Sequence, residues 1–340
     1  MRFLGARLII TLLTLLLVSM LTFAAFTCIP GDPVSLALGI EATDEQIATM
    51  RAELGLDRSL PVRYGLWLGR FLTGNWGNSV RFRGAAIADM VRERLPVTST
   101  LAFLALFFII IIAIPTALLA ARREGSFLDR AVSTLTPITI SFPGFFLGVL
   151  FIWVFGLILK CFTPGAYVSY QDNFGGFLRY LLFPALAIAL PNAAVVIKFL
   201  RGSLLQQLRS DYVRTAYSKG ASQTWVLYHH VLKNAFIPAL TVLGMIIGEI
   251  FSGSIVIEQV FTIPGIGRLL IASITSRDYP LIQTLVVYIA CMVILANTLV
   301  DIGIQWLDPR IRVRSCSVVY RRHTEIKPRT TQTNGETLEK

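Results

Sequence analysis

Apolar residues are gathered along this chain in six long blocks separated by polar intervals. A helix rises about 1.5 Å per residue, so about 20 residues cross the roughly 30 Å hydrocarbon core of a bilayer. Each block is close to that length. The pattern therefore predicts an all-α polytopic membrane protein with six transmembrane helices, at residues 8–29, 97–121, 131–159, 180–197, 235–260 and 279–300.

The polar intervals divide the chain into four regions. Their predicted roles are an N-terminal transmembrane helix, an extracytoplasmic region with a short helix capped by Thr43 or Asp44, a five-helix core, and a basic, disordered cytoplasmic tail. The regions are 1–29, 30–96, 97–309 and 310–340.

Composition supports the membrane class and sets the expected orientation. Hydrophobic residues make up 54% of the chain and charged residues 15%, whereas soluble domains carry about 25% charged residues. The net charge is +11, but the basic residues collect beside the apolar blocks and in the tail, as the positive-inside rule requires. We therefore expect no nucleic-acid partner. Arg2 and Arg7 place the N-terminus in the cytoplasm, and six crossings return the C-terminus there.

The first apolar block also raises the alternative of a cleaved signal peptide. The apolar region of a signal peptide usually spans about 7–15 residues and ends in a small-residue cleavage site. The block at 8–29 is longer, and residues 26–28 supply no such site. An uncleaved helix is the preferred interpretation.

Residue patterns for catalysis or metal binding are absent from the sequence. The chain has no G-x-x-x-x-G-K-[ST], H-E-x-x-H or G-x-S-x-G, so it has no ATP-binding loop of its own and no catalytic set. Its cysteines lie far apart without a C-x-x-C pair, which favours small apolar fillers over a disulfide or metal site. They are Cys28, Cys161, Cys291 and Cys316.

Two features inside the apolar blocks are candidates for a path across the membrane. Pro143 and Gly144 interrupt the third block, where freed carbonyls must find partners in the protein interior or beside a pathway. A packing kink without substrate contact is equally compatible. Glu249 lies deep in the fifth block, where an ionised acid costs roughly 2.5–3.5 kcal/mol and should face protein or water. It either meets a cationic part of a substrate, or pairs with another subunit or is protonated. Glu258 and Asp301, near block ends, are expected to contact interface water.

Residues 211–234 form a long polar interval between the fourth and fifth blocks. Gly220 predicts a break between two short helices, and Ser222 can cap the second. An amphipathic connector lying on the membrane surface remains an alternative. Docking into another protein would require a small residue, which Ala216 supplies, and exposed aromatic residues, for which the candidates are Tyr212, Tyr217 and Trp225.

This interval resembles the coupling loop of ATP-binding-cassette importer permeases, written E-A-A-x-x-x-G. Arg214 stands for the first Glu, Thr215 for the first Ala and Lys233 for a later Pro. These departures from the sugar-importer form agree with the dipeptide, oligopeptide and nickel branch, which usually reads R-T-A-x-x-K-G and ends in R-N-A. The resemblance implies a cytoplasmic coupling loop at 203–234. Its expected residues are Tyr212, Arg214, Thr215, Ala216, Lys219, Gly220, Trp225, His230, Leu232 and Asn234.

Further motifs follow in the order of the same branch. They include P-G-D-P, G-N-W-G-N-S, V-F-T-I-P-G-I-G-R-L-L, R-D-Y-P and L-D-P-R-I-R. The resemblance places one motif set in an extracytoplasmic loop between the last two spans. Its residues are Pro264, Gly265, Gly267, Arg268, Asp278, Tyr279 and Pro280.

The resemblance covers nearly the whole chain and implies a type I importer permease fold in the inner membrane of a bacterium. The implied partners are a second permease, two ATPase subunits that use ATP and Mg, an extracytoplasmic substrate-binding protein, and membrane lipid. No cofactor is expected on this chain, and it is not itself an enzyme. Di- or oligopeptides are the expected substrates, with nickel, glutathione or another small solute as alternatives within the family. A stand-alone secondary transporter is the alternative from another class, but such proteins usually show charge relays or inverted repeats, and neither is evident.

Overall fold

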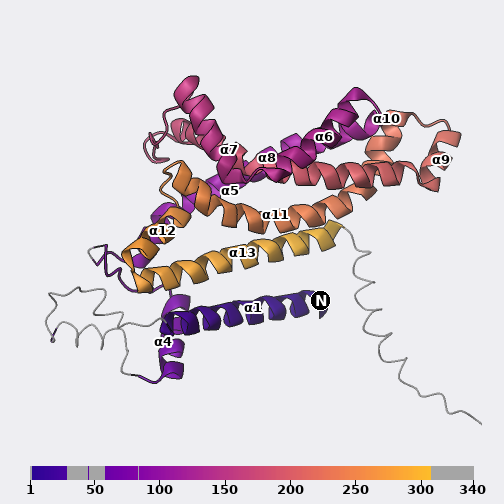
Figure 1. Ribbon diagram of the computed structural model, residues 1–340. Helices are drawn as coiled ribbons and strands as arrows, with labels where there is room; N and C mark the ends of the chain where they lie inside the picture. Colours follow the sequence, from indigo (N-terminus) through magenta and orange to yellow (C-terminus); the bar gives the residue numbers. More distant parts are fainter. Residues whose placement is uncertain (1, 29–44, 46–57, 83, 308–340) are drawn as a thin grey trace, which may run out of the picture.

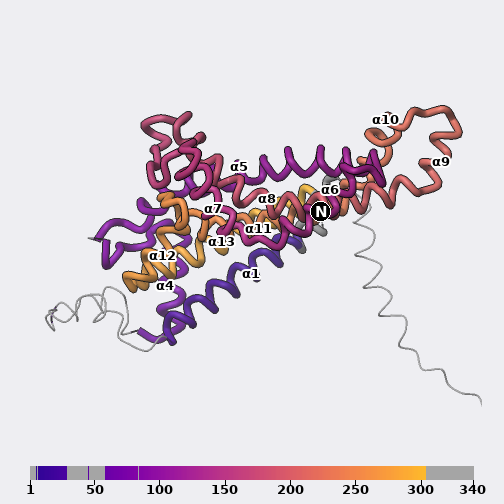
Figure 2. Tube along the Cα trace, turned by 45° about the horizontal axis from the view of Figure 1, so that its top comes forward, coloured from indigo at the N-terminus to yellow at the C-terminus, as the bar shows by residue number. Residues whose placement is uncertain are grey.

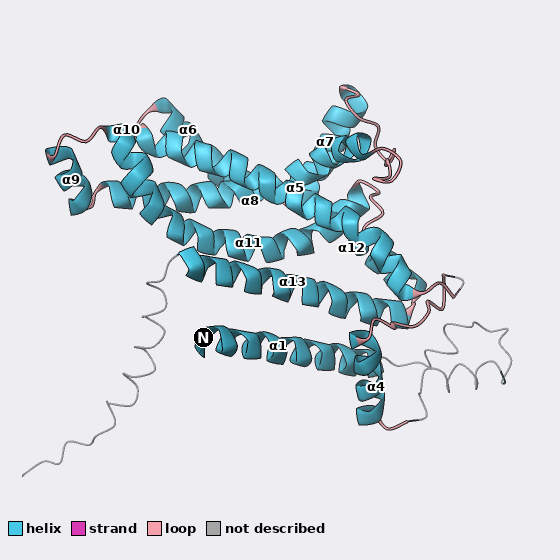
Figure 3. Cartoon of the chain, turned by 180° about the vertical axis from the view of Figure 1, so that it is seen from behind, coloured by secondary structure: helices cyan, strands magenta, loops and turns pink. Residues whose placement is uncertain are grey.

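The computed structural model describes residues 2–28, 45, 58–82 and 84–307 of the 340-residue chain. Within these residues every extended regular element is a helix, and one isolated bridge joins Asn78 to Ala86 (Figure 3). Several predicted features lie outside the described residues: the cap at Thr43 or Asp44, the P-G-D-P motif and the basic tail. Of the L-D-P-R-I-R motif, only Leu307 is described. The elements are α1 Arg2–Thr27, α4 Leu60–Leu72, α5 Ile87–Arg122, α6 Phe127–Ser141, α7 Gly144–Phe151, η1 Ile152–Ile158, α8 Phe174–Leu208, α9 Asp211–Ser218, α10 Gln223–Val226, η2 Leu227–Val231, α11 Leu232–Val260, α12 Ile266–Ser276 and α13 Tyr279–Leu307.

The helices run roughly side by side, as a bundle that crosses a membrane requires (Figure 1). Five described helical runs are long and apolar enough to cross, and a sixth crossing results if α6 and α7 count as one broken span. The all-helical polytopic prediction is thus confirmed. The predicted boundaries are too narrow, since α5 begins at Ile87 rather than at 97 and α8 covers Phe174–Leu208 rather than 180–197.

The third predicted span is not straight. Helices α6 and α7 meet at an angle of 95°. Phe142 adopts an extended conformation with ψ 121°, as the residue before a proline prefers, and Pro143 then caps α7. Pro137, in contrast, lies inside α6 without ending it. Of the two proline interruptions in this block, only the one at Pro143 redirects the chain.

Helix α8 occupies the centre of the bundle and packs against α5, α6, α7 and α11 (Figure 2). Helices α5 and α8 pack extensively against each other, and both carry buried small residues of the kind that lets two backbones approach closely in a membrane. These buried alanines are Ala113, Ala117 and Ala121 on α5 and Ala185, Ala189 and Ala193 on α8.

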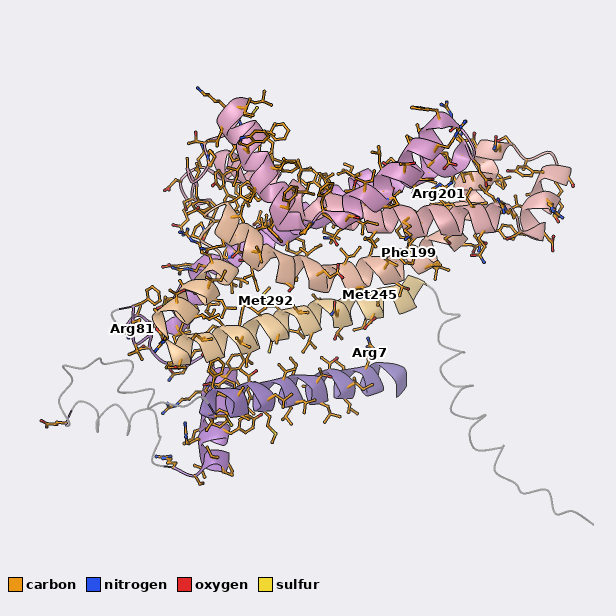
Figure 4. All side chains as sticks on the ribbon, in the orientation of Figure 1. Arg7, Arg81, Phe199, Arg201, Met245 and Met292 are labelled. Atoms are coloured by element: carbon orange, nitrogen blue, oxygen red, sulfur yellow. The ribbon has the colours of Figure 1, made fainter. Side chains whose placement is uncertain are left out.

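Helix α1 packs along α13, and polar contacts fix their register. Arg7 forms an ion pair with Asp301, and Thr11 and Thr298 share a hydrogen bond of 3.0 Å (Figure 4). The prediction that Asp301 contacts only interface water is therefore wrong. Polar groups inside apolar helices pair with one another because lipid offers them no partner.

At the C-terminal end of α5, a second ion pair joins the start of α6 to α8. Arg201 donates to both carboxylate oxygens of Asp129, at 2.6 and 2.9 Å, and the Gly125 amide donates to the same carboxylate at 3.0 Å. The Asp129 side chain is only 6% exposed. A similar link between Arg209 and Glu124, at 2.8 Å, lies in the open, with side chains 74% and 49% exposed.

These two links predict different effects of removing their arginines. Arg201→Gln leaves the buried Asp129 carboxylate without its main partner and should destabilise the protein by about 3 kcal/mol, whereas Arg209→Gln should change stability by less than about 1 kcal/mol. Thermal unfolding of both variants in detergent measures the difference. Equal losses would contradict a structural role confined to the buried pair.

Candidate functional site

The polar interval after α8 folds as an elbow, which we define as residues 209–231. Helix α9 ends at Ser218, and Gly220 then adopts φ +82°, a conformation that favours glycine, with its amide donating to the Tyr217 carbonyl at 2.9 Å. Ser222 caps the next helix by accepting a hydrogen bond from the Trp225 amide at 3.4 Å. The predicted break at Gly220 and cap at Ser222 are both confirmed.

The second half of the elbow differs from the prediction of two separate short helices. Helix α10 continues through the π-helical turn η2 into α11, so residues Gln223–Val260 form one helical run. Of the two helices in the elbow, only α9 is separate from the helix that follows it. It projects from the end of the bundle, beyond the ends of its neighbours (Figure 1).

Helix α9 is anchored on one side and open on the other. Val213 is fully buried, and Ala216 packs against the main core. The aromatic residues predicted to be exposed are so: Tyr212, Tyr217 and Trp225 are 37%, 39% and 45% exposed. A helix with a fixed inner face and an exposed aromatic outer face is suited to contact another protein.

A cavity of about 620 Å³ lies between α9 and α10. It brings together seven of the ten residues expected in the coupling loop, whereas Arg214, Leu232 and Asn234 do not line it. The seven are Tyr212, Thr215, Ala216, Lys219, Gly220, Trp225 and His230.

Two histidines pack around one indole ring in this elbow. His229 stacks on Trp225 with ring centroids 5.0 Å apart, and His230 meets the same ring edge-on at 4.8 Å. These contacts give both histidines a packing role. In the described part of the chain no group of three His, Cys, Asp or Glu side chains is arranged to hold a metal ion.

At the other end of the bundle, Glu258 forms a buried set of hydrogen bonds with Thr98 and the I-P-G-I-G-R motif, which we call the Glu258 latch. Its carboxylate accepts hydrogen bonds from the Thr98 hydroxyl at 2.6 Å and from the Arg268 amide at 3.0 Å. The Ile266 amide in turn donates to Thr98 at 2.9 Å. Glu258 is fully buried, so the prediction that it contacts interface water is wrong. A carboxylate is stabilised at the N-terminus of α12 because the first amides of a helix have no partner within the helix.

The two motif glycines make room for this latch. A Cβ on Gly265 would lie 2.2 Å from the Glu258 carboxyl carbon, and a Cβ on Gly267 would lie 2.5 Å from the Ile255 Cα. Both positions therefore exclude a side chain. Glu258 does lie near the end of the fifth apolar block, but its packing against Thr98 and the start of α12 shields it from water.

A second buried carboxylate ties distant motifs together. Asp278 of R-D-Y-P accepts hydrogen bonds from the Ser79 hydroxyl and from the Arg81 amide, the latter at 3.2 Å. Ser79 belongs to G-N-W-G-N-S, almost 200 residues earlier in the sequence. Several residues of the predicted loop motif, Gly265, Gly267 and Asp278, are thus buried and hold the protein together, while Arg268, Tyr279 and Pro280 remain partly exposed.

The candidate pathway residues lie on two different helices. Pro143 and Gly144 begin α7, and a Cβ on Gly144 would lie 3.3 Å from the Ala187 carbonyl oxygen of α8, a contact that favours close packing. Glu249 is exposed on α11, one turn after Met245, which is 70% exposed (Figure 4). Glu249 therefore lies on a face of α11 that the described part of this chain leaves uncovered.

The bundle of long apolar helices, with a short elbow helix projecting beyond its end, is the architecture of a polytopic membrane protein. Residues 113–313 match the family described as "Binding-protein-dependent transport system inner membrane component", and residues 1–102 match the N-terminal membrane component of the same systems. The chain belongs to this family of multi-pass inner-membrane permeases of ATP-binding-cassette importers.

Similar proteins cover almost the whole chain. The probable peptide ABC transporter permease protein y4tP of Sinorhizobium fredii is 37% identical over 306 residues, which are 90% of this chain and 97% of that protein. The oligopeptide transport system permease protein AppB of Bacillus subtilis is 32% identical over 307 residues, again 90% and 97%. Among solved structures, the inward-facing MetNI methionine ABC transporter matches with a TM-score of 0.52 and 17% identity, over 64% of this chain and 96% of that chain, which supports the fold.

The Glu258 latch predicts a specific pattern of coupling between substitutions. Gly265→Ala and Gly267→Ala should each destabilise the protein by about 1–3 kcal/mol through overpacking. Adding Glu258→Ala should relieve much of the loss at Gly265, where the carboxylate is the nearest group. It should relieve less at Gly267, where the Ile255 Cα is nearest and the carboxylate oxygen lies farther away, at 3.0 Å.

A double-mutant cycle on thermal unfolding in detergent tests this pattern. If the stability losses of Glu258→Ala and Gly265→Ala simply add in the double variant, the close contact between the two residues is contradicted.

Proposed function

We propose that this chain forms half of the translocation pathway of a di- or oligopeptide importer. Support comes from the similar proteins y4tP and AppB, which are named as peptide and oligopeptide permeases and each match 90% of the chain. In this proposal a second, related permease completes the pathway, two ATPase subunits consume ATP with Mg, and an extracytoplasmic binding protein delivers the substrate.

The elbow is the observation that carries this function. Its helix α9 exposes Tyr212 and Tyr217 while Val213 anchors it to the bundle. We assign to this exposed face the contact with an ATPase subunit. Because α10 is continuous with α11, a displacement of the elbow would be transmitted along a helix that carries Glu249 on its uncovered face. Rigid-body movement of such helices can switch the open side of a pathway between two states.

The charge distribution supports a cytoplasmic elbow and cytoplasmic termini. Basic side chains collect around the elbow end of the bundle, where a cytoplasmic surface normally carries them. Arg7 of α1 also lies at the elbow end of the bundle, where it pairs with Asp301 of α13 (Figure 4). The basic residues flanking the described helices there are Arg122, Arg123, Arg130, Lys198, Arg201, Arg209, Arg214, Lys219 and Lys233.

We expect Gly220→Ala to weaken coupling between ATP hydrolysis and uptake. The substitution places a side chain at φ +82°, which costs about 1–2 kcal/mol in the left-handed region, and so distorts the turn that orients α9. The tagged chain is purified in mild detergent with its partners, and ATP hydrolysis and peptide uptake are measured after reconstitution. Gly74→Ala, at φ +78° at the opposite end of the bundle, is the strain-matched control and should retain coupling.

Two results would overturn the proposed function. One is a chain that purifies without any P-loop ATPase. The other is uptake that continues when ATP is depleted while ion gradients are maintained, which would indicate a secondary transporter. Equal loss of coupling in the Gly220 and Gly74 variants would leave the importer standing but remove the special role of the elbow.

Glu249 provides a test of substrate contact. If its carboxylate faces the pathway, Glu249→Gln should lower uptake of cationic peptides more than uptake of neutral peptides, because only the charge is removed. Uptake of the two peptide classes is compared in reconstituted vesicles. Equal uptake by variant and wild type for both classes would exclude the contact.

A further inference from the structure

Helix α4, Leu60–Leu72, has no buried residue. It lies across the end of α1, at a steep angle to the spanning helices (Figures 1 and 3). It follows α1 in the chain and precedes α5, and it takes no part in the elbow or the Glu258 latch. Neither its position nor its composition is explained by the proposed transport function.

A continuous row of aromatic rings fixes α4 to the spanning helices. Tyr64 meets Phe23 of α1 with centroids 5.4 Å apart, and its hydroxyl shares a hydrogen bond of 2.8 Å with Ser19. At the other end Trp76 meets Tyr288 of α13 at 5.4 Å. Neighbouring rings along the row are 5.4–6.2 Å apart, in the order Phe23, Tyr64, Trp67, Phe71, Trp76 and Tyr288. The side of α4 that contacts the bundle is therefore defined.

The remaining surface of α4 is apolar except for one basic strip. Arg63 and Arg70 lie seven residues apart and so on the same side of the helix. Arg63 is half-buried, with its guanidinium carbon 5.9 Å from the centroid of the Phe23 ring of α1, whereas Arg70 is exposed. Every other exposed residue of α4 is apolar or glycine. The large ones are Leu60, Val62, Leu66 and Leu72, which are 53%, 48%, 40% and 77% exposed. A helix surrounded by water would carry polar residues at these positions.

The position of α4 along α1 corresponds to the depth of a membrane interface. Its contacts on α1, Ser19 and Phe23, precede Thr27 by eight and four residues, which is about 12 and 6 Å at 1.5 Å per residue. An interfacial helix buries its apolar face about 5–10 Å into the boundary between headgroups and acyl chains. The outer side of α1 is itself lined by exposed leucines, so the apolar surface of α4 continues a surface that faces lipid.

We propose that α4 is an interfacial helix that inserts Leu60, Val62, Leu66 and Leu72 into the lipid surface around the end of α1. The exposed Arg70 then meets phosphate groups of the lipids, while the row of tyrosine, tryptophan and phenylalanine rings lies at the depth where aromatic residues collect in membrane proteins. The occupant of this apolar surface is the bilayer, and the proposal does not depend on which substrate the permease carries.

Spin labels on single cysteines test this placement in the full-length protein. The native cysteines are replaced by serine, and the label is attached at Leu66→Cys or Leu72→Cys in the permease complex reconstituted into phosphatidylethanolamine–phosphatidylglycerol vesicles. Leu13→Cys, on the exposed side of α1, is the lipid control, and Gln171→Cys, in an exposed loop, is the water control. Power saturation compares collisions with oxygen, which partitions into lipid, and with a water-soluble nickel chelate.

Labels on α4 should resemble the Leu13 label, with high oxygen collision and loss of nickel collision relative to Gln171. Two results would overturn the proposal. Labels on α4 that resemble Gln171 would place the helix in water. Labels that lose nickel collision only after an extracytoplasmic binding protein is added would assign the surface to that protein instead. Uptake and ATP hydrolysis of each labelled complex confirm that it is folded, and they separate this result from the test of the proposed function.

Discussion

The fold depends on one constraint: polar groups inside a bilayer must be satisfied by the protein itself. The bundle meets it by pairing. Asp301 is neutralised by Arg7, Asp129 by Arg201, and the free amides of α12 by Glu258 and Thr98. Extensive contact between α5 and α8, both of which carry buried alanines, supplies the packing that lipid-facing side chains cannot provide.

The same constraint explains why functional and structural motifs overlap in this chain. The I-P-G-I-G-R and R-D-Y-P motifs surround two buried carboxylates, Glu258 and Asp278. Each accepts a hydrogen bond from a residue distant in sequence, Glu258 from the Thr98 hydroxyl and Asp278 from the Arg81 amide. The elbow motif shows the opposite arrangement, because its aromatic side chains are exposed and its glycine turns the chain. A motif whose polar groups are satisfied internally positions an element, whereas one that leaves aromatic residues exposed is suited to contact a partner.

Hydropathy predicted the spans because a bilayer imposes both length and composition on them. Gly220, Ser222 and Pro143 were also readable from the sequence, since each acts through its own backbone or the adjacent turn. The pairings of Glu258 with α12 and of Ser79 with Asp278 were not, because they join residues that only the fold brings together. Span ends were predicted too short for a related reason: helices such as α5 continue past the apolar block, where the propensity of charged residues for helix does not appear as hydropathy.

The most direct test of this account is a structure of the complex that purifies with the tagged chain. The account predicts α9 seated in a cleft of a P-loop ATPase subunit, with Tyr212 and Tyr217 buried in the contact and Gly220 at the turn beside it. An ATPase bound elsewhere on the chain, with α9 still exposed, would contradict it.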